Sequence, residues 1–183
     1  IDGIEIEAQP DETVLDCARR LGIDVPTLCQ DDRLDPSASC RMCLVEVAGA
    51  RGLQPSCAMK PADGMVVQTA SDPVKRHRKL LLSLYLADHA LDADGLPMDR
   101  GAGNRLRDYV QAYGAGPDFA PIGRKREGRV DANPYIQFDP EACITCGACV
   151  QYCDQVEAVS AITLAGRGAA TTIATAEQIG LLD

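Results

Sequence analysis

Apolar positions recur at helical spacing in three stretches of the chain, so we predict three helices there. In the first, Asp11 or Thr13 is placed to cap the start and Gly22 to end the helix. In the second, Pro73 lies near the first helical position. Its apolar run 80–87 is broken by a serine, which predicts a helix buried on one side only. The three predicted helices are 10–22, 71–89 and 104–114.

Short apolar runs with alternation or β-branching predict strands between these helices. The first nine residues predict a hairpin, because Asp2-Gly3 is a turn signal followed by alternating apolar positions. A second hairpin is predicted near the end of the chain, turned at Arg167-Gly168. Further strands are predicted at 43–49, 65–69 and 134–139, and the last hairpin has strands at 161–166 and 171–176. This order predicts an α+β fold with a mixed sheet.

The chain also contains nine cysteines among its 183 residues, and these fall into two groups. Five lie in the first third of the chain and four lie between positions 143 and 153. An odd number of cysteines in a chain without a visible signal peptide argues against a disulfide scaffold and favours metal ligation. The chain has no Trp, two Phe and five Tyr, so its cores are thin, and bound metal would add folding free energy.

The charge balance excludes several classes of partner. The chain has 18 Lys+Arg against 27 Asp+Glu, a net charge of −9, whereas nucleic acids and anionic membrane surfaces attract basic patches. No stretch reaches the roughly 20 apolar residues that a bilayer span needs. Because no signal peptide is visible either, we predict a cytoplasmic protein that binds no nucleic acid and has no membrane span.

The first group of cysteines contains four thiols that form a candidate [2Fe–2S] site. Cys29, Cys40, Cys43 and Cys57 are separated by ten, two and thirteen residues, and four thiolates are what such a cluster requires. Small residues at 36–39 let backbone N–H groups approach the cluster sulfurs. A zinc site is the alternative, although zinc sites usually combine two short C-x-x-C motifs and only one is present. Cys17 is predicted to be a buried residue of the first helix.

The second group forms a candidate [4Fe–4S] site in the run CITCGACVQYC. Cys143, Cys146, Cys149 and Cys153 are separated by two, two and three residues, which is typical of bacterial iron–sulfur proteins. In those proteins the fourth cysteine usually serves another cluster, completed by a second run of cysteines. No second run follows Cys153. Gly147 and Ala148 leave room for the backbone to turn around a cluster, and a zinc knuckle remains the alternative.

Both groups of cysteines resemble a known family. The stretches PTLCQDDRLDPSASCRMCLVEVAG and PSCAMKPADGMVVQT resemble the N-terminal [2Fe–2S] domain shared by three kinds of protein. These are the large iron–sulfur subunit of complex I, the alpha subunits of NAD-dependent formate dehydrogenases, and related hydrogenase subunits. The resemblance covers nearly all of residues 1–70. It implies a ferredoxin-like β-grasp fold and assigns Cys29, Cys40, Cys43 and Cys57 as the four cluster ligands.

The stretch YIQFDPEACITCGACVQYCDQV resembles the same family, including Asp154 after the last cysteine. In the family, the residues that match Cys143, Cys146 and Cys149 bind one [4Fe–4S] cluster, and the match to Cys153 joins another. The second cysteine run follows shortly after the last hairpin, and this chain stops at Asp183, just where it would begin. We therefore expect an N-terminal piece of a longer polypeptide, as a start at Ile1 also suggests. A short protein in which Cys153 closes a single cluster is the alternative.

The middle of the chain departs from the family pattern. Relatives bind another cluster there through one histidine and three cysteines, and His89 matches the histidine. The cysteine positions fall on Ala93, Leu96 and Ala102, or on Arg105 for the last one in another alignment. One imidazole cannot hold a four-iron cluster, so we predict that no cluster binds here and that His89 is a helix-end histidine. His77 is predicted to be a solvated residue.

Together these features predict an α+β protein in three parts. They are a β-grasp [2Fe–2S] ferredoxin-type domain at 1–70, a helical connector at 71–132 and a partial bacterial-ferredoxin-like [4Fe–4S] segment at 133–183. A second [4Fe–4S] cluster is expected if the chain continues. Such a protein relays electrons and has no catalytic residues of its own.

The resemblance implies the alpha subunit of an NAD-dependent formate dehydrogenase. The rest of that complex would contain a molybdopterin site with Mo or W, FMN and NAD. Its flavin- and NAD-binding subunit and its small iron–sulfur subunits would be the partners. One alternative is a diaphorase-type subunit of an NAD-linked hydrogenase or of complex I. The other is a zinc-binding interaction module, which would be colourless, whereas an iron–sulfur protein is brown.

Overall fold

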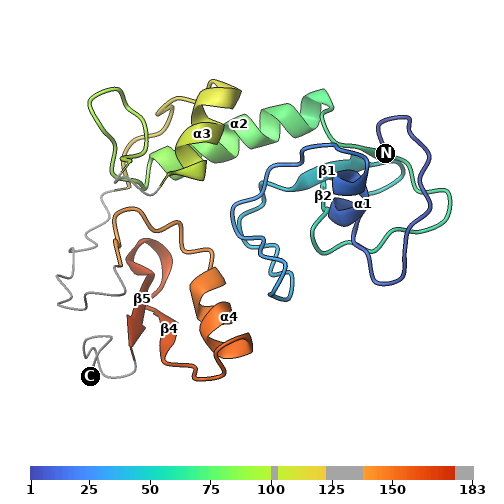
Figure 1. Ribbon diagram of the computed structural model, residues 1–183. Coiled ribbons are helices and arrows are strands. Elements are labelled where there is room, and N and C mark those ends of the chain that lie inside the picture. Colours follow the sequence, from blue (N-terminus) through green and yellow to red (C-terminus); the bar gives the residue numbers. More distant parts are fainter. Residues whose placement is uncertain (100–102, 123–137, 176–183) are drawn as a thin grey trace.

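The chain folds into three connected parts, shown in Figure 1. The computed structural model describes residues 1–99, 103–122 and 138–175. A small sheet with one helix forms the N-terminal domain, two packed helices form the middle, and one helix with a hairpin forms the C-terminal unit. The predicted α+β class is therefore confirmed. In the described residues no helix is long and apolar enough to cross a membrane.

The N-terminal domain is built on a three-stranded antiparallel sheet. Strand β1 (Leu44–Val47) lies in the centre and pairs with β2 (Gln54–Pro55) on one side and β3 (Val67–Gln68) on the other. In this register Leu44 lies opposite Pro55, and Val47 lies opposite Val67. Because the strands are short, the sheet itself supplies few hydrogen bonds, and the domain depends on packing against its helix.

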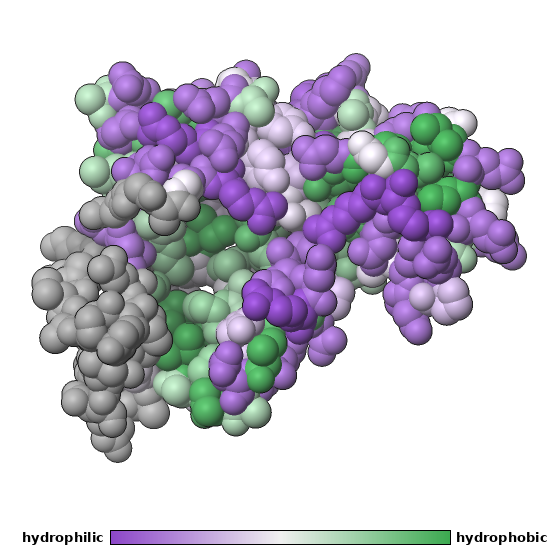
Figure 2. Space-filling view, viewed as in Figure 1, coloured by the Kyte–Doolittle hydropathy of each residue, from purple (hydrophilic) through white to green (hydrophobic). Residues whose placement is uncertain are grey.

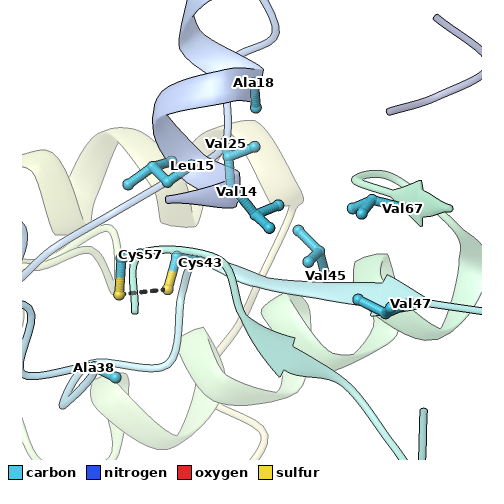
Figure 3. Close-up of a cluster of buried hydrophobic side chains, with 10 residues drawn as sticks. All are labelled: Val14, Leu15, Ala18, Val25, Ala38, Cys43, Val45, Val47, Cys57 and Val67. Atoms are coloured by element: carbon cyan, nitrogen blue, oxygen red, sulfur yellow. Dashed lines mark hydrogen bonds between the residues drawn. The ribbon is translucent and has the colours of Figure 1, made fainter. Parts of the chain in front are cut away.

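Helix α1 (Val14–Arg20) covers this sheet with its apolar face. Figure 3 shows Val14, Leu15 and Ala18 of the helix grouped with valines of the sheet. The sulfurs of Cys43 and Cys57 lie in the same buried cluster. Two of the four candidate [2Fe–2S] ligands are therefore held in the core of the domain.

The predicted helix is confirmed over a shorter range than 10–22, and Thr13 is the residue that caps it. The Asp16 backbone N–H donates to Thr13 Oγ1 at 3.2 Å, and the Thr13 N–H donates to the Asp16 carboxylate at 2.9 Å. This reciprocal capping box satisfies two amide donors at the helix start. At the other end Gly22 has a φ of 73°, which a residue with a side chain rarely adopts.

The middle of the chain consists of two packed helices. Helix α2 (Asp72–Leu86) begins after Ser71, and α3 (Arg105–Tyr113) begins with a cap from Asn104 and ends at Gly114. The buried face of α2 carries Leu82 and Leu86, whereas Leu80 and Leu84 are exposed. The prediction of a helix buried on one side is therefore confirmed, as is the third predicted helix.

The C-terminal unit consists of α4 (Ala148–Gln155) and a hairpin of β4 (Ile162–Ala165) and β5 (Thr172–Thr175). The predicted hairpin is confirmed, and its turn contains a short 3-10 helix at Gly168–Ala170. Figure 2 shows polar side chains over most of the visible face, with apolar ones on this unit, along its border with the helices, and in a patch at the upper right over the N-terminal domain. Its exposed apolar residues include Val156, Val159 and Leu164.

Several predicted elements differ from the structure. The opening residues make the predicted turn, with the Ile4 N–H donating to the Ile1 carbonyl at 2.9 Å, but they form no hairpin. The expected mixed sheet is also wrong for the N-terminal domain, since both pairings described there are antiparallel. Most of the strand predicted at 134–139 lies outside the described residues. Strand β2 and helix α4 were not predicted.

Candidate metal centres

The thiols of the first group come together in the N-terminal domain as two pairs. Cys29, Cys40, Cys43 and Cys57 are all buried. The sulfurs of Cys43 and Cys57 lie 3.2 Å apart, as Figure 3 shows. In the other pair, the Cys40 backbone N–H donates to the Cys29 sulfur at 3.5 Å. The two pairs also lie within electrostatic reach of each other, since the charges of Cys29 and Cys40 act on Cys57, although the four residues span 28 positions of the sequence.

Left-handed backbone conformations occur within the loop from Cys29 to Cys40 and just after it, where backbone N–H groups approach the sulfurs. Ala38 and Arg41 have φ values of 52° and 58°, a left-handed conformation that is uncommon for residues other than glycine. Such strain is typical of functional sites, where the surrounding structure maintains it. The Leu28 N–H donates to the Cys40 sulfur at 3.4 Å. Backbone donors therefore reach the sulfurs, as the small residues of this loop predict.

Hydrogen bonds divide each pair into one acidic thiol and one weakly acidic thiol. The hydrogen bond from Cys40 lowers the pKa of Cys29 to about 5, and the hydrogen bond from Cys57 lowers that of Cys43 to about 6. The pKa values of the donors Cys40 and Cys57 are raised, first by these same hydrogen bonds and then by burial. Two of the four groups are therefore thiolates at neutral pH, and the other two lose their protons when metal binds.

This donor set fits a [2Fe–2S] cluster. Such a cluster takes four thiolates, and the paired arrangement offers two sulfurs to each of two irons. A single zinc ion would need four ligands that converge on one point. Among the residues that the structure describes, no group of three or more His, Cys, Asp or Glu side chains is arranged around one ion position. The two thiol pairs thus supply the four thiolates that a two-iron group needs, and a four-cysteine zinc site stays the alternative.

The second group of thiols surrounds the start of α4. Thr145 and Gly147 have positive φ values of 53° and 77°, and they turn the backbone between successive cysteines. The Thr145 N–H donates to the Cys143 sulfur at 3.3 Å. Burial raises the pKa of Cys149, and the charges of Cys146 and Cys143 raise it further. The first three cysteines of the run therefore lie within electrostatic reach of one another, as a shared cluster requires.

Cys153 has different neighbours. It lies four residues after Cys149 on α4, and so on the same face of the helix. Its sulfur accepts a hydrogen bond from the Ala161 N–H at 3.2 Å, and its carbonyl accepts one from the Val159 N–H at 3.0 Å. The segment leading to β4 therefore holds this residue. The contact is compatible with either predicted role, that is, closing the local cluster or serving a second one.

The two candidate sites face each other across one apolar layer. Cys29 and Cys40 of the first site belong to the same hydrophobic cluster as Cys146 of the second, together with Tyr85 from α2. Burial raises the pKa of Cys146, and the charge of Cys29 adds to this effect. Burial also raises the pKa of Tyr85, whose hydroxyl donates to the Cys40 carbonyl at 3.2 Å. Tyr85 therefore lies between the two groups of thiols.

Polar contacts dock α4 against the loop between Cys29 and Cys40. The guanidinium of Arg33 lies over the ring of Tyr152, 4.7 Å from its centroid. The Asp35 N–H donates to Gln155 Oε1 at 2.9 Å, and Gln151 Nε2 donates to the Asp35 carbonyl at 3.3 Å. The loop that carries ligands of the first site thus also positions the helix of the second.

The stretch after His89, which resembles the one-histidine, three-cysteine site of relatives, contains no thiol. After His89 the chain makes a turn held by Asp92, whose carboxylate accepts hydrogen bonds from the backbone and forms an ion pair with Arg107. Ala93 and Leu96 lie in this turn, and Ala102 lies outside the described residues. The absence of a cluster here stays a prediction. His77 was predicted to be solvated, but it is half-buried and its Nε2 lies 3.3 Å from the Arg41 carbonyl.

Comparison with known proteins agrees with these two sites. Residues 1–72 match the model of the 2Fe-2S iron-sulfur cluster binding domain, and residues 136–155 match that of the 4Fe-4S binding domain. The ferredoxin-like fold of the N-terminal part and the ferredoxin-type C-terminal segment are therefore confirmed.

Similar proteins include components of large oxidoreductases. An NADH-quinone oxidoreductase subunit of Rhizobium meliloti (strain 1021) is 40% identical over 178 residues, which is 94% of this chain and 20% of the relative. The alpha subunit of NADPH-Fe(3+) oxidoreductase of Geobacter sulfurreducens (strain DL-1 / KN400) is 34% identical over 178 residues, which is 97% of this chain and 21% of the relative. The chain thus spans about a fifth of the length of these curated relatives.

A solved structure matches almost the whole chain. It is a chain of an NAD+-reducing [NiFe]-hydrogenase in the H2-reduced state, with a TM-score of 0.82 and 31% identity. The match covers 96% of this chain and 73% of the hydrogenase chain. The resemblance to complex I and hydrogenase subunits is confirmed, while the names of these three proteins do not mention formate. The chain therefore belongs to the family of iron–sulfur proteins that includes this hydrogenase chain and that joins a 2Fe-2S cluster binding domain to a 4Fe-4S binding domain.

Proposed function

We propose that this chain is an electron-transfer module of an oxidoreductase complex. Cys29, Cys40, Cys43 and Cys57 would hold a [2Fe–2S] cluster, and Cys143, Cys146 and Cys149 would hold a [4Fe–4S] cluster, with Cys153 as its fourth ligand or as a ligand of a second cluster. When bound, such clusters supply one-electron oxidation and reduction at iron. The observation that carries the proposal is the placement of two groups of thiols on either side of one apolar layer.

The other residues of the chain would support this transfer by position and not by bond chemistry. Backbone donors such as the N–H groups of Leu28 and Thr145 hydrogen-bond to ligand sulfurs, which tunes their potential. The apolar residues packed around Tyr85 would limit the access of water to the space between the sites. The contact of Arg33 with Tyr152 fixes the separation of the two parts.

We further propose an NADH- or NADPH-linked complex as the parent of this chain. The names of the three similar proteins support this choice over the NAD-dependent formate dehydrogenase that the sequence first suggested. FMN, NAD and any molybdopterin would then be bound outside these residues. The partners would be a flavin- and NAD-binding subunit and small iron–sulfur subunits, in the cytoplasm.

The first prediction concerns the ligands of the N-terminal site. Cys40→Ser in the native full-length polypeptide, purified without oxygen, is expected to abolish the [2Fe–2S] EPR signal and to leave that of the other cluster. The reason is that a hydroxyl replaces one of four thiolates at one site only. Cys17→Ser is the matched control, because Cys17 is equally buried in this domain but donates to Glu12. Retention of both signals in Cys40→Ser, or an absence of iron and sulfide in the unaltered protein, would contradict the proposal.

The identity of the parent complex is tested by recording the visible absorption spectrum of the native assembly. NADH or NADPH is expected to bleach the iron–sulfur absorbance, because these reductants would deliver electrons through the flavin subunit. Bleaching by formate in their place would favour the formate dehydrogenase. A protein that is colourless and contains zinc would favour an interaction module.

A further inference from the structure

Helix α2 contacts the segment 40–44 through a series of polar side chains. This segment carries two of the proposed [2Fe–2S] ligands, and each of its carbonyl groups except that of Cys43, which accepts from Ser56, lies against a side chain of the helix. The donors and their acceptors are Tyr85 to Cys40 at 3.2 Å, His77 to Arg41 at 3.3 Å, and Arg78 to both Met42 and Leu44 at 3.2 Å each. A single helix therefore fixes the orientation of almost every peptide unit in the ligand segment.

This orientation turns the positive ends of the peptide dipoles toward sulfur. The carbonyl of the Arg41–Met42 peptide faces His77, so its N–H points the opposite way. There the Met42 N–H forms a hydrogen bond with the Cys40 thiol, and this bond favours the thiolate. Contacts on the far side of the segment thus have an electrostatic effect at the ligands.

Arg78 differs from the other donors because it carries a full charge in the protein interior. The residue is only 3% exposed. Besides the two carbonyls, its guanidinium reaches the Tyr113 hydroxyl at 3.1 Å and lies 6.0 Å from the centroid of the Tyr113 ring. In the part of the chain that the structure describes, no carboxylate forms an ion pair with Arg78. Buried charges in proteins are normally paired, so a negative group near the guanidinium would stabilise it further.

We infer that Arg78 is the counter-charge of the [2Fe–2S] cluster and raises its reduction potential. The inference rests on the proposed function. The carbonyls of Met42 and Leu44 flank the ligand Cys43, so the guanidinium is attached to both sides of the cluster-binding backbone. Four thiolates make the oxidised cluster negative, and one electron from the donor adds a further negative charge as one ferric iron becomes ferrous. No bond breaks and no proton moves.

A fixed cation in a dry site stabilises the reduced cluster more than the oxidised one, because the attraction grows with the negative charge. Arg78 is therefore a tuning and positioning residue and not a ligand. A purely structural role would also explain the hydrogen bonds of Arg78. In that case, replacing Arg78 would lower the stability of the protein and leave the reduction potential of the cluster unchanged. The reduction potential consequently separates the two explanations.

The second prediction is a redox titration of the cluster-loaded protein, followed by the [2Fe–2S] EPR signal. At the midpoint potential of the unaltered protein, Arg78→Gln is expected to lower the ratio of reduced to oxidised cluster about tenfold, a shift of about 59 mV for a one-electron couple. Arg78→Lys keeps the charge and is expected to retain most of the potential. Arg76→Gln is the matched control, since Arg76 lies on the exposed face of α2, where water and salt screen its charge.

A second pair of variants tests the charge while Arg78 stays in place. Tyr113→Glu brings a carboxylate to the guanidinium and is expected to lower the potential relative to the neutral Tyr113→Gln. This pair keeps the inference open to refutation if Arg78→Gln fails to fold. An unchanged potential in Arg78→Gln, an equal fall in Arg78→Lys, or equal potentials in the two Tyr113 variants would overturn the inference alone. Loss of the [2Fe–2S] signal from the unaltered protein would instead overturn the proposed function.

Discussion

Burial does not distinguish the cysteines of the N-terminal domain, but their hydrogen bonds do. Cys17 is as buried as the proposed ligands. Its pKa is raised, first by burial and then by the Glu12 carboxylate to which it donates, so it stays protonated at neutral pH. Cys29 and Cys43 accept hydrogen bonds from neighbouring thiols, and their pKa values fall to about 5 and about 6. The hydrogen bonds therefore separate Cys29 and Cys43 from Cys17, whereas the pKa values of Cys40 and Cys57 are raised like that of Cys17.

The third prediction concerns His89 in the middle of the chain. His89→Ala is expected to leave the iron content unchanged, because the turn that follows is held by Asp92 and contains no thiol. Iron and sulfide analysis of the purified protein provides the measurement. A loss of about four irons, the content of one [4Fe–4S] cluster, would show that His89 holds a cluster after all.

Among the elements, α2 has the widest influence because it packs against both neighbours. Its apolar residues Leu82 and Leu86 share one cluster with α3 and with the thiols of both sites. Its polar residues Arg78 and Tyr85 hold the ligand segment. The helix is therefore the structural link between the N-terminal domain and the C-terminal unit.

The fourth prediction tests this packing. Leu82→Ala is expected to lower the free energy of unfolding by about 2–5 kcal/mol, the usual cost of a cavity at a buried leucine. Leu84→Ala on the exposed side of the same helix is the control, with an expected change within about 0.5 kcal/mol. Urea unfolding followed by circular dichroism gives both values. Similar losses in the two variants would mean that the assigned buried face of α2 is wrong.

Elements with strong local signals could be predicted from the sequence. The caps at Thr13 and Asn104 and the apolar periodicity of α2 act within a few residues, so the helices are where the pattern places them. Strand β2 has only two residues and exists because β1 lies beside it. Helix α4 begins after a left-handed glycine inside the cysteine run, where ligand spacing hides the helical period. Such elements depend on contacts that are distant in sequence.

The candidate metal sites, like the helices and strands, could be predicted only in part from the sequence. Spacing and resemblance singled out the eight thiols, and the structure brings them into two groups. Arg78 went unnoticed because it lies in the basic run KRHRK, where an exposed position is the ordinary expectation. Its position on the helix, four residues before the buried Leu82, was the available signal.

At the scale of the whole molecule, the two candidate sites are held together by a small interface. The apolar layer around Tyr85 is supplemented by the contacts of α4 with Arg33 and Asp35. Asp31 forms an ion pair with Arg33, and the hydrogen bonds from Arg33 lower the pKa of Asp31 to about 2. The pair therefore stays charged throughout the physiological range and keeps Arg33 in place over Tyr152.

The fifth prediction concerns this interface. Arg33→Ala is expected to weaken the magnetic coupling between the two reduced clusters, because α4 loses its cationic contact and its distance from the first site becomes less fixed. The relaxation rate of the [2Fe–2S] signal measures the coupling. Arg19→Ala is the control, since Arg19 pairs with Asp32 in the same loop but does not reach α4. Equal relaxation rates in both variants would contradict the role of Arg33.

The loop between Cys29 and Cys40 has one further consequence, for maturation in the cell. Arg33 and Asp35 belong to this loop and contact α4, so binding of a cofactor by Cys29 and Cys40 at the two ends of the loop would hold the contact surface of α4 in place. We therefore expect iron and sulfide to be inserted sequentially, with the N-terminal centre assembled before the C-terminal one. Incompletely matured molecules should accordingly lack the second centre far more often than the first.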